Sequence, residues 1–186
     1  MIGYVDESAR EAAGGIYVVA SAVVVEDPGA VREAVRKVLL PGQRRYHWHA
    51  ERESRRHEML DRMVELDVHV FGYVCRETGG GRRQERARAR ALRRLLWDTG
   101  HHGVAELVIE SRHAAANSRD RQTIVRAQRA GEAPAALRYG FGKPDEEPLL
   151  WLPDAGAGAV AAAAAGDTDT YLRRLGSCVE LVEVEP

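Results

Sequence analysis

Two spacings of hydrophobic residues alternate along this chain of 186 residues. Runs of β-branched and apolar residues at 2–6 and 16–25 flank a Gly14-Gly15 turn signal, a combination that predicts a β-hairpin. Shorter runs of the same kind predict further strands at 44–49, 68–75, 104–110, 137–139 and 179–184.

Between these runs, apolar residues recur every three or four positions, which is the spacing of an amphipathic helix. This pattern predicts helices over 29–40, 53–66, 83–98, 119–129, 149–165 and 169–175. Asp27 before Pro28 is a helix start signal, and Pro41-Gly42 ends the first helix. An order that mixes strands and helices in this way predicts an α/β fold, with a mixed β-sheet flanked by α-helices in a single domain over 1–186.

The charge and composition of the chain exclude several classes of protein. The chain has 27 Lys and Arg against 28 Asp and Glu, so it is not a strongly basic nucleic-acid clamp. No apolar run reaches the ~18 residues of a membrane span, and no secretory signal pattern opens the chain, so we expect a cytoplasmic protein without membrane contact. Cys75 and Cys178 lie in separate apolar runs and are expected to be buried thiols.

Three carboxylates occupy positions where an α/β sheet places functional groups. Asp6 and Glu110 end predicted strands, and Asp154 begins a predicted helix. If the two strands are neighbours, these side chains meet in one crevice, and Asp120 is close enough in the predicted order to join them. Hard divalent cations such as Mg²⁺ bind oxygen ligands of this kind.

The motifs Gly3-Tyr4-Val5-Asp6-Glu7-Ser8 and Leu149-Leu150-Trp151-Leu152-Pro153-Asp154-Ala155, together with the strand at 16–25, resemble the bacterial and phage family called domain of unknown function 3800. This resemblance implies a ribonuclease-H-like fold. It places Asp6 and Glu7 on the acidic motif of the first strand and Asp154 on the acidic position of the late helix. Glu110 and Asp120 would fill the remaining acidic places. The chain departs from the family pattern at Ala9, where Gly is usual, and at Trp151, where Gln is usual.

The resemblance and the acids together predict a nuclease that depends on Mg²⁺ or Mn²⁺ and hydrolyses phosphodiester bonds of RNA or DNA. The predicted catalytic residues are Asp6, Glu110, Asp154, Asp120 and Glu7, of which Asp6, Glu110 and Asp154 bind the metal. The predicted substrate-binding residues are Arg44, Arg45, His47, His49 and Arg112.

Two other functions stay open at this point. The same fold without catalysis would be a nucleic-acid-binding or protein-binding module, which the arginine clusters and the missing Gln favour. Alternatively, His47, His49 and Glu51 on one face of a short strand would suit a transition-metal hydrolase.

The arginines themselves are weak evidence, because only Lys37 and Lys143 among the basic residues are lysine. The cluster at 82–94 is therefore either a solvated helix face or a surface for phosphates. The run 179–184 is a candidate edge strand for pairing in a homodimer, although its alternating glutamates oppose this.

Overall fold

A six-stranded mixed sheet forms the centre of the computed structural model, which describes residues 1–10, 15–76 and 81–185. The strands are β1 (Ile2–Arg10), β2 (Ile16–Val24), β3 (His69–Arg76), β4 (Glu106–Glu110), β5 (Arg138–Gly142) and β6 (Val179–Glu183). Their order in the sheet is β5-β4-β1-β2-β3-β6. β2 is antiparallel to its neighbours β1 and β3, whereas the pairs β1 with β4, β4 with β5 and β3 with β6 are parallel. The predicted hairpin is confirmed, although part of its turn lies outside the described residues.

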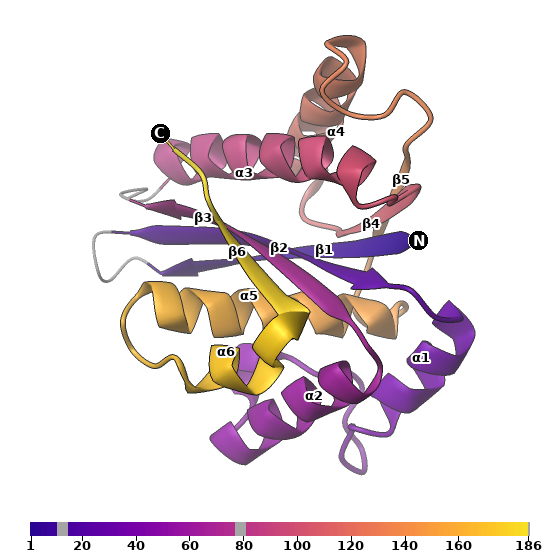
Figure 1. Ribbon diagram of the computed structural model, residues 1–186, viewed down its shortest axis with the longest axis vertical. Coiled ribbons are helices and arrows are strands. Elements are labelled where there is room, and N and C mark those ends of the chain that lie inside the picture. The colour runs from indigo at the N-terminus through magenta and orange to yellow at the C-terminus, as the bar shows by residue number, and fades with distance from the viewer. Residues whose placement is uncertain (11–14, 77–80, 186) are drawn as a thin grey trace.

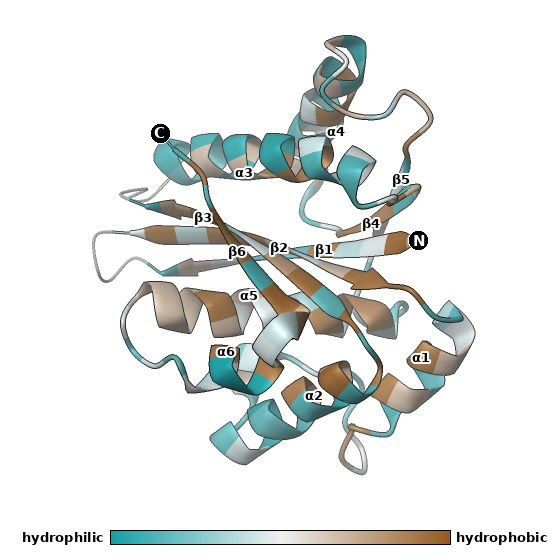
Figure 2. Ribbon diagram, in the orientation of Figure 1, coloured by the Kyte–Doolittle hydropathy of each residue, from teal (hydrophilic) through white to brown (hydrophobic). Residues whose placement is uncertain are grey.

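Six α-helices in the described part of the chain cover the two faces of this sheet. They are α1 (Pro28–Arg36), α2 (Glu53–Glu65), α3 (Arg82–His101), α4 (Ala114–Arg129), α5 (Trp151–Ala164) and α6 (Thr170–Leu175). One face packs against α3 and α4, and the other packs against α5, with α1, α2 and α6 outside it (Figure 1). The hydropathy colouring shows the apolar sheet between the more polar outer surfaces of the helices (Figure 2).

Each face of the sheet takes alternate residues of the same strand, as a pleated strand requires. Tyr4 belongs to the core beneath α5, and Val5 belongs to the core beneath α3. β2 lies in the middle of the sheet with both faces covered, so all of its nine residues are buried. This explains why its sequence is apolar at every position except Ser21 instead of alternating.

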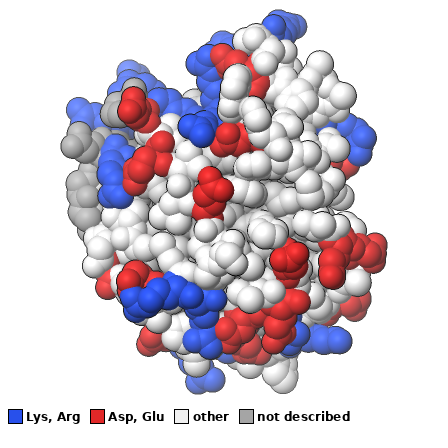
Figure 3. Space-filling view, in the orientation of Figure 1, with Lys and Arg blue, Asp and Glu red and all other residues white. Residues whose placement is uncertain are grey.

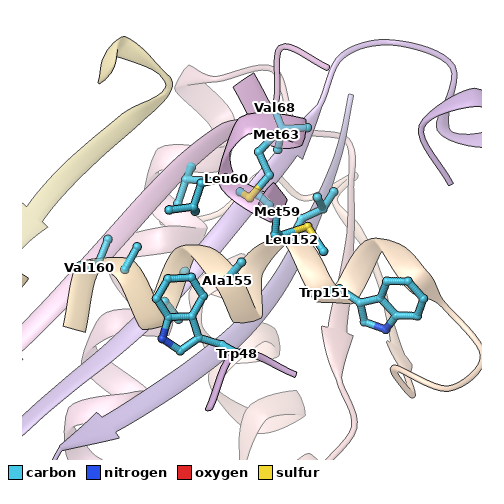
Figure 4. Packing of buried hydrophobic residues seen from close by; sticks show 14 of the residues in the cluster. Trp48, Met59, Leu60, Met63, Val68, Trp151, Leu152, Ala155 and Val160 are labelled. Carbon is cyan, nitrogen blue, oxygen red and sulfur yellow. The ribbon is translucent and has the colours of Figure 1, made fainter. Parts of the chain in front are cut away.

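The glycines of α5 allow this helix to lie close to its neighbours. A Cβ built on Gly158 would lie 2.2 Å from Cδ1 of Trp48, and one on Gly156 would lie 2.8 Å from Cγ1 of Val70. Figure 4 shows Trp48 against α5, with Met59 and Leu60 of α2 nearby. The low helix propensity of glycine at these positions is therefore offset by close packing.

The structure corrects the predicted strand at 44–49. These residues form an irregular segment that ends in a 3₁₀ turn, Trp48–Ala50. Tyr46 and Trp48 produced the alternating pattern, but both side chains are buried in the core beside α5, and the segment pairs with no described strand.

Several element boundaries also differ from the prediction. α1 ends at Arg36, four residues short of its predicted end and before the Pro41-Gly42 stop signal, and α3 continues to His101, three residues beyond its predicted end. α4 begins at Ala114, five residues before the predicted start, because Nδ1 of His113 accepts a hydrogen bond from the Ala116 N–H and caps the helix. β1 continues to Arg10, so that Asp6 lies within this strand and not at its end. Within the described ranges, no helix has the length and apolar character needed to cross a membrane.

Candidate active site

The site lies where β4 stops and β1 continues. The parallel pairing of these strands ends at Val5 and Ile109, so Asp6 and Glu110 are the next residues on neighbouring strands. Tyr4 and Val108, two positions earlier, both contact the core beneath α5. Because strand residues alternate between faces, Asp6 and Glu110 lie on that same face, where the first turn of α5 carries Asp154.

A pocket of about 250 Å³ opens at this position. Its lining residues are Asp6, Glu7, Arg45, Tyr46, His47, His49, Glu110, Arg112, Pro144, Leu150, Trp151 and Asp154. Eight of the ten site residues proposed from the sequence thus line one pocket. Arg44 and Asp120 are the two that do not.

Asp6 and Glu110 form an electrostatically strained pair. The Asp6 residue is only 7% exposed. Burial raises the pKa of Asp6 well above its ordinary value, and the negative charges of Glu110, Glu7 and Asp154 raise it further. Burial also raises the pKa of Glu110, and the negative charges of Asp154 and Glu7 raise it further. A bound cation would relieve this mutual repulsion.

Asp154 is fixed by the irregular segment that replaces the predicted strand. Its Oδ2 accepts a hydrogen bond from the Trp48 backbone N–H at 2.9 Å and lies 3.2 Å from Nδ1 of His47. The hydrogen bond to Asp154 raises the pKa of His47. Both contacts use Oδ2, and Oδ1 of Asp154 has no hydrogen-bond partner among the described residues.

His49 has a different environment from His47. Its Nε2 lies 3.5 Å from Oγ of Ser8, two residues beyond Asp6 on β1. Burial lowers the pKa of His49, which favours the neutral imidazole at neutral pH. The pocket therefore places an imidazole with a raised pKa beside one with a lowered pKa.

Glu7 reaches the pocket from the opposite face of β1 and is held there by arginines. Arg88 of α3 is 1% exposed and forms ion pairs with Glu7 and with Asp120 of α4. Arg112 also pairs with Asp120, at 3.1 Å, and lies 3.6 Å from Glu7. Asp120, proposed from the sequence as a fourth acid of the site, thus pairs with these two arginines and does not line the pocket.

The alternative set of His47, His49 and Glu51 does not form. Glu51 turns away from the histidines, accepts a hydrogen bond from Gln43 and lies 3.5 Å from Arg55. The one-face geometry expected of these residues required a strand that the structure lacks.

The side chains of the pocket show which kind of metal ion it could bind. Among the described residues, no three His, Cys, Asp or Glu side chains are already arranged as a metal-binding group. The chemistry nevertheless fits a hard divalent cation, because the donors of Asp6, Glu110 and Asp154 are carboxylate oxygens and the Asp6 and Glu110 carboxyls repel one another. These three side chains would hold the ion.

Sequence reasoning missed two residues that shape the pocket walls, Tyr46 and Pro144, and named Trp151 only as a departure from the family pattern. Tyr46, Trp151 and Pro144 line the pocket, and the Trp151 Nε1–H donates to the Pro144 carbonyl at 2.9 Å. The apolar residues of 44–49 were the available signal, but they were interpreted as a strand.

Comparison of this chain with protein-family models, with curated proteins and with solved structures gives no match.

Proposed function

We propose that this protein is a divalent-metal-dependent hydrolase of phosphodiester bonds, acting on nucleic acid. The observation that carries the proposal is the meeting of Asp6, Glu110 and Asp154, from two strands and a helix, in one pocket. In open α/β sheets, ligands bind beyond the carboxyl ends of parallel strands, which is where β4 ends in this molecule.

The three carboxylates would bind Mg²⁺ or Mn²⁺. When bound, such an ion activates water and stabilises the leaving oxygen of a phosphodiester. Arg45 and Arg112, which line the same pocket, supply the positive charge that draws a phosphate toward an acidic site. His47, oriented by Asp154, is placed to hold a proton at the pocket wall.

The arrangement supports a ribonuclease-H-like fold within the α/β class. The resemblance to the domain of unknown function 3800 family implies an acidic pair on the first strand and an acid on a late helix. Asp6 and Glu7 on β1 and Asp154 on α5 satisfy both expectations.

A non-catalytic binding module on the same scaffold is the second candidate. The observation that favours it is Trp151, which is buried and whose only ring N–H is bonded to Pro144. The residue that stands where the family has Gln therefore offers no polar group to the site.

The test is titration of Mn²⁺ into the purified protein by calorimetry, in parallel with Asp6→Asn and Glu110→Gln variants. We expect binding by the wild type and loss of at least tenfold in affinity in each variant, because each removes a carboxylate ligand. Asp61→Asn on α2 is the matched control, since it neutralises a half-exposed carboxylate that pairs with Arg174 and does not line the pocket.

Cleavage of labelled RNA and DNA with Mn²⁺ and with EDTA then separates the two candidates. Metal-dependent cleavage that Asp6→Asn abolishes supports the hydrolase. Wild-type Mn²⁺ binding that both variants retain would refute the proposed metal site, and Mn²⁺ binding without cleavage of either polymer would favour the binding module.

A further inference from the structure

Charge is distributed very unevenly between the part of the chain that holds α3 and α4 and the remainder. Residues 82–129 contain 12 arginines against five acids, whereas the other residues contain 15 basic side chains against 23 acids. The choice of arginine over lysine in this chain does not explain why the basic residues gather in one region. In Figure 3, Lys and Arg side chains lie over α3 and α4 in the upper part of the view, with Asp and Glu side chains between them, and a further group lies in the lower part.

A groove between α3 and α4 collects several of these arginines. Its volume is about 360 Å³, and the polar residues that line it are Arg90, Arg93, Thr123, Arg126 and Glu132. We call it the basic groove. Glu132 is paired with Arg93, while Arg90 and Arg126 form no ion pair with the described residues. The Nε of Arg90 is buried without a hydrogen-bond partner among those residues.

The arginines on each wall follow one face of their helix. On α3, Arg86, Arg90 and Arg93 are spaced by four and three residues, and on α4 Arg119 and Arg126 are spaced by seven. Both spacings align side chains in a row along a helix. Of these arginines, Arg90 and Arg93 of α3 and Arg126 of α4 line the groove, so both of its walls carry positive charge, which attracts a polyanion.

An aromatic side chain lies at one end of this surface. Trp97 of α3 is 50% exposed and lines a second hollow of about 360 Å³ that shares Arg90, Arg93 and Glu132 with the basic groove. One side of its indole lies against His101, with ring centroids 5.5 Å apart. An exposed indole beside arginines is a stacking platform for an unpaired base, because the bases of a duplex already stack on one another.

The basic groove is also connected to the pocket through side-chain contacts. Arg112, which lines the pocket, pairs with Glu85 of α3 at 3.0 Å, and Glu85 pairs with Arg119 of α4 at 2.9 Å. Arg119 belongs to the same row as Arg126. A chain of ion-paired side chains thus leads from the pocket lining to the face of α4 that carries Arg126.

We propose that the basic groove binds single-stranded nucleic acid, with Arg90 and Arg126 contacting phosphates and Trp97 stacking on a base. This inference rests on the proposed function, for which it names the substrate class and the surface outside the pocket.

The test measures binding of a fluorescein-labelled oligothymidylate by fluorescence anisotropy at several salt concentrations. EDTA is present throughout, so that the result does not depend on the metal site. For Arg90→Ala/Arg126→Ala we expect weaker binding and a salt dependence reduced by about 0.7 per arginine on a log-log plot. For Trp97→Ala we expect about tenfold weaker binding with an unchanged salt dependence, because stacking releases no counterions.

The matched control is Arg36→Ala/Arg173→Ala, which removes two exposed arginines from α1 and α6 and changes the net charge equally. It should bind as the wild type does. Circular dichroism and Mn²⁺ titration establish that each variant is folded, and Arg126→Ala alone serves if the double variant is not.

Three results would overturn the inference. These are absence of oligothymidylate binding by the wild type, equal losses in the control and groove variants, and tighter binding of duplex or poly-glutamate than of the single strand. Failure of Mn²⁺ to bind would instead refute the proposed function and leave this binding unaffected, so the two failures are distinguishable.

Discussion

The charge of Asp6 opposes folding, because this carboxylate is buried and faces other acids. Its pKa in the folded protein is raised above the ordinary value of 3.8. A group whose pKa is raised on folding favours the folded state at low pH, and this contribution is lost as the pH rises through the folded-state pKa. The burial of Asp6 among other acids therefore lowers the free energy of unfolding at neutral pH relative to low pH.

We accordingly expect Asp6→Asn to raise the melting temperature at neutral pH while it removes Mn²⁺ binding. The amide oxygen still accepts the Glu7 N–H hydrogen bond, which Asp6 accepts at 2.7 Å. Thermal melts from about pH 4 to pH 8 should show a gain that shrinks toward low pH. If Asp6→Asn melts at a lower temperature than the wild type across this range, the burial of the Asp6 carboxylate does not destabilise the folded protein.

Some of the site residues could be predicted from the sequence, and others could not. Asp6 and Glu110 follow apolar strands, and neighbouring parallel strands bring such residues together, so local pattern and topology suffice. Asp120 occupies a similar helical context to Asp154, yet Arg88 and Arg112 hold it outside the pocket lining. Arg88 and Asp120 are 32 residues apart in the sequence, so the spacing of apolar residues could not predict that they pair.

At the scale of elements, α5 depends on its small residues to lie close to the sheet and to Trp48. We expect Gly158→Ala to lower the free energy of unfolding by about 1–3 kcal/mol, because the new methyl would overlap the buried indole. Urea denaturation measures the change. Gly100→Ala is the matched control, because Gly100 is an exposed glycine of α3 where a new Cβ would meet only Pro134, at 3.4 Å. If Gly158→Ala has the same free energy of unfolding as the wild type, Trp48 moves aside without cost and the close packing at Gly158 is not required.

The elements themselves were largely predictable, because most of them have one periodicity and a clear boundary signal. The helix at 53–66 and the strand at 68–75 needed only their apolar spacing. The segment 44–49 failed because Tyr46 and Trp48 alternate as strand residues do, while the hydrogen bond from Trp48 to Asp154 holds the backbone in an irregular path. That bond joins residues 106 positions apart, so local pattern could not reveal it.

At the scale of the whole molecule, the sheet leaves the outer edge of β6 without a partner among the described residues. This edge carries an exposed apolar residue, Leu181 at 41%, between Glu180 and Glu183, which are also exposed. Charged residues on an edge strand oppose pairing with a second chain, since each added strand would bring like charges together.

We therefore expect Glu180→Thr/Glu183→Thr to associate through this edge, whereas Leu181→Lys does not. Sedimentation velocity at increasing protein concentration should show a rising sedimentation coefficient for the threonine variant alone. Loss of the ion pair between Arg76 and Glu183 is a second effect of that variant, and Arg76→Gln controls for it. If the wild type already sediments as a dimer that Leu181→Lys dissociates, the glutamates do not protect this edge and β6 is instead the interface of a homodimer.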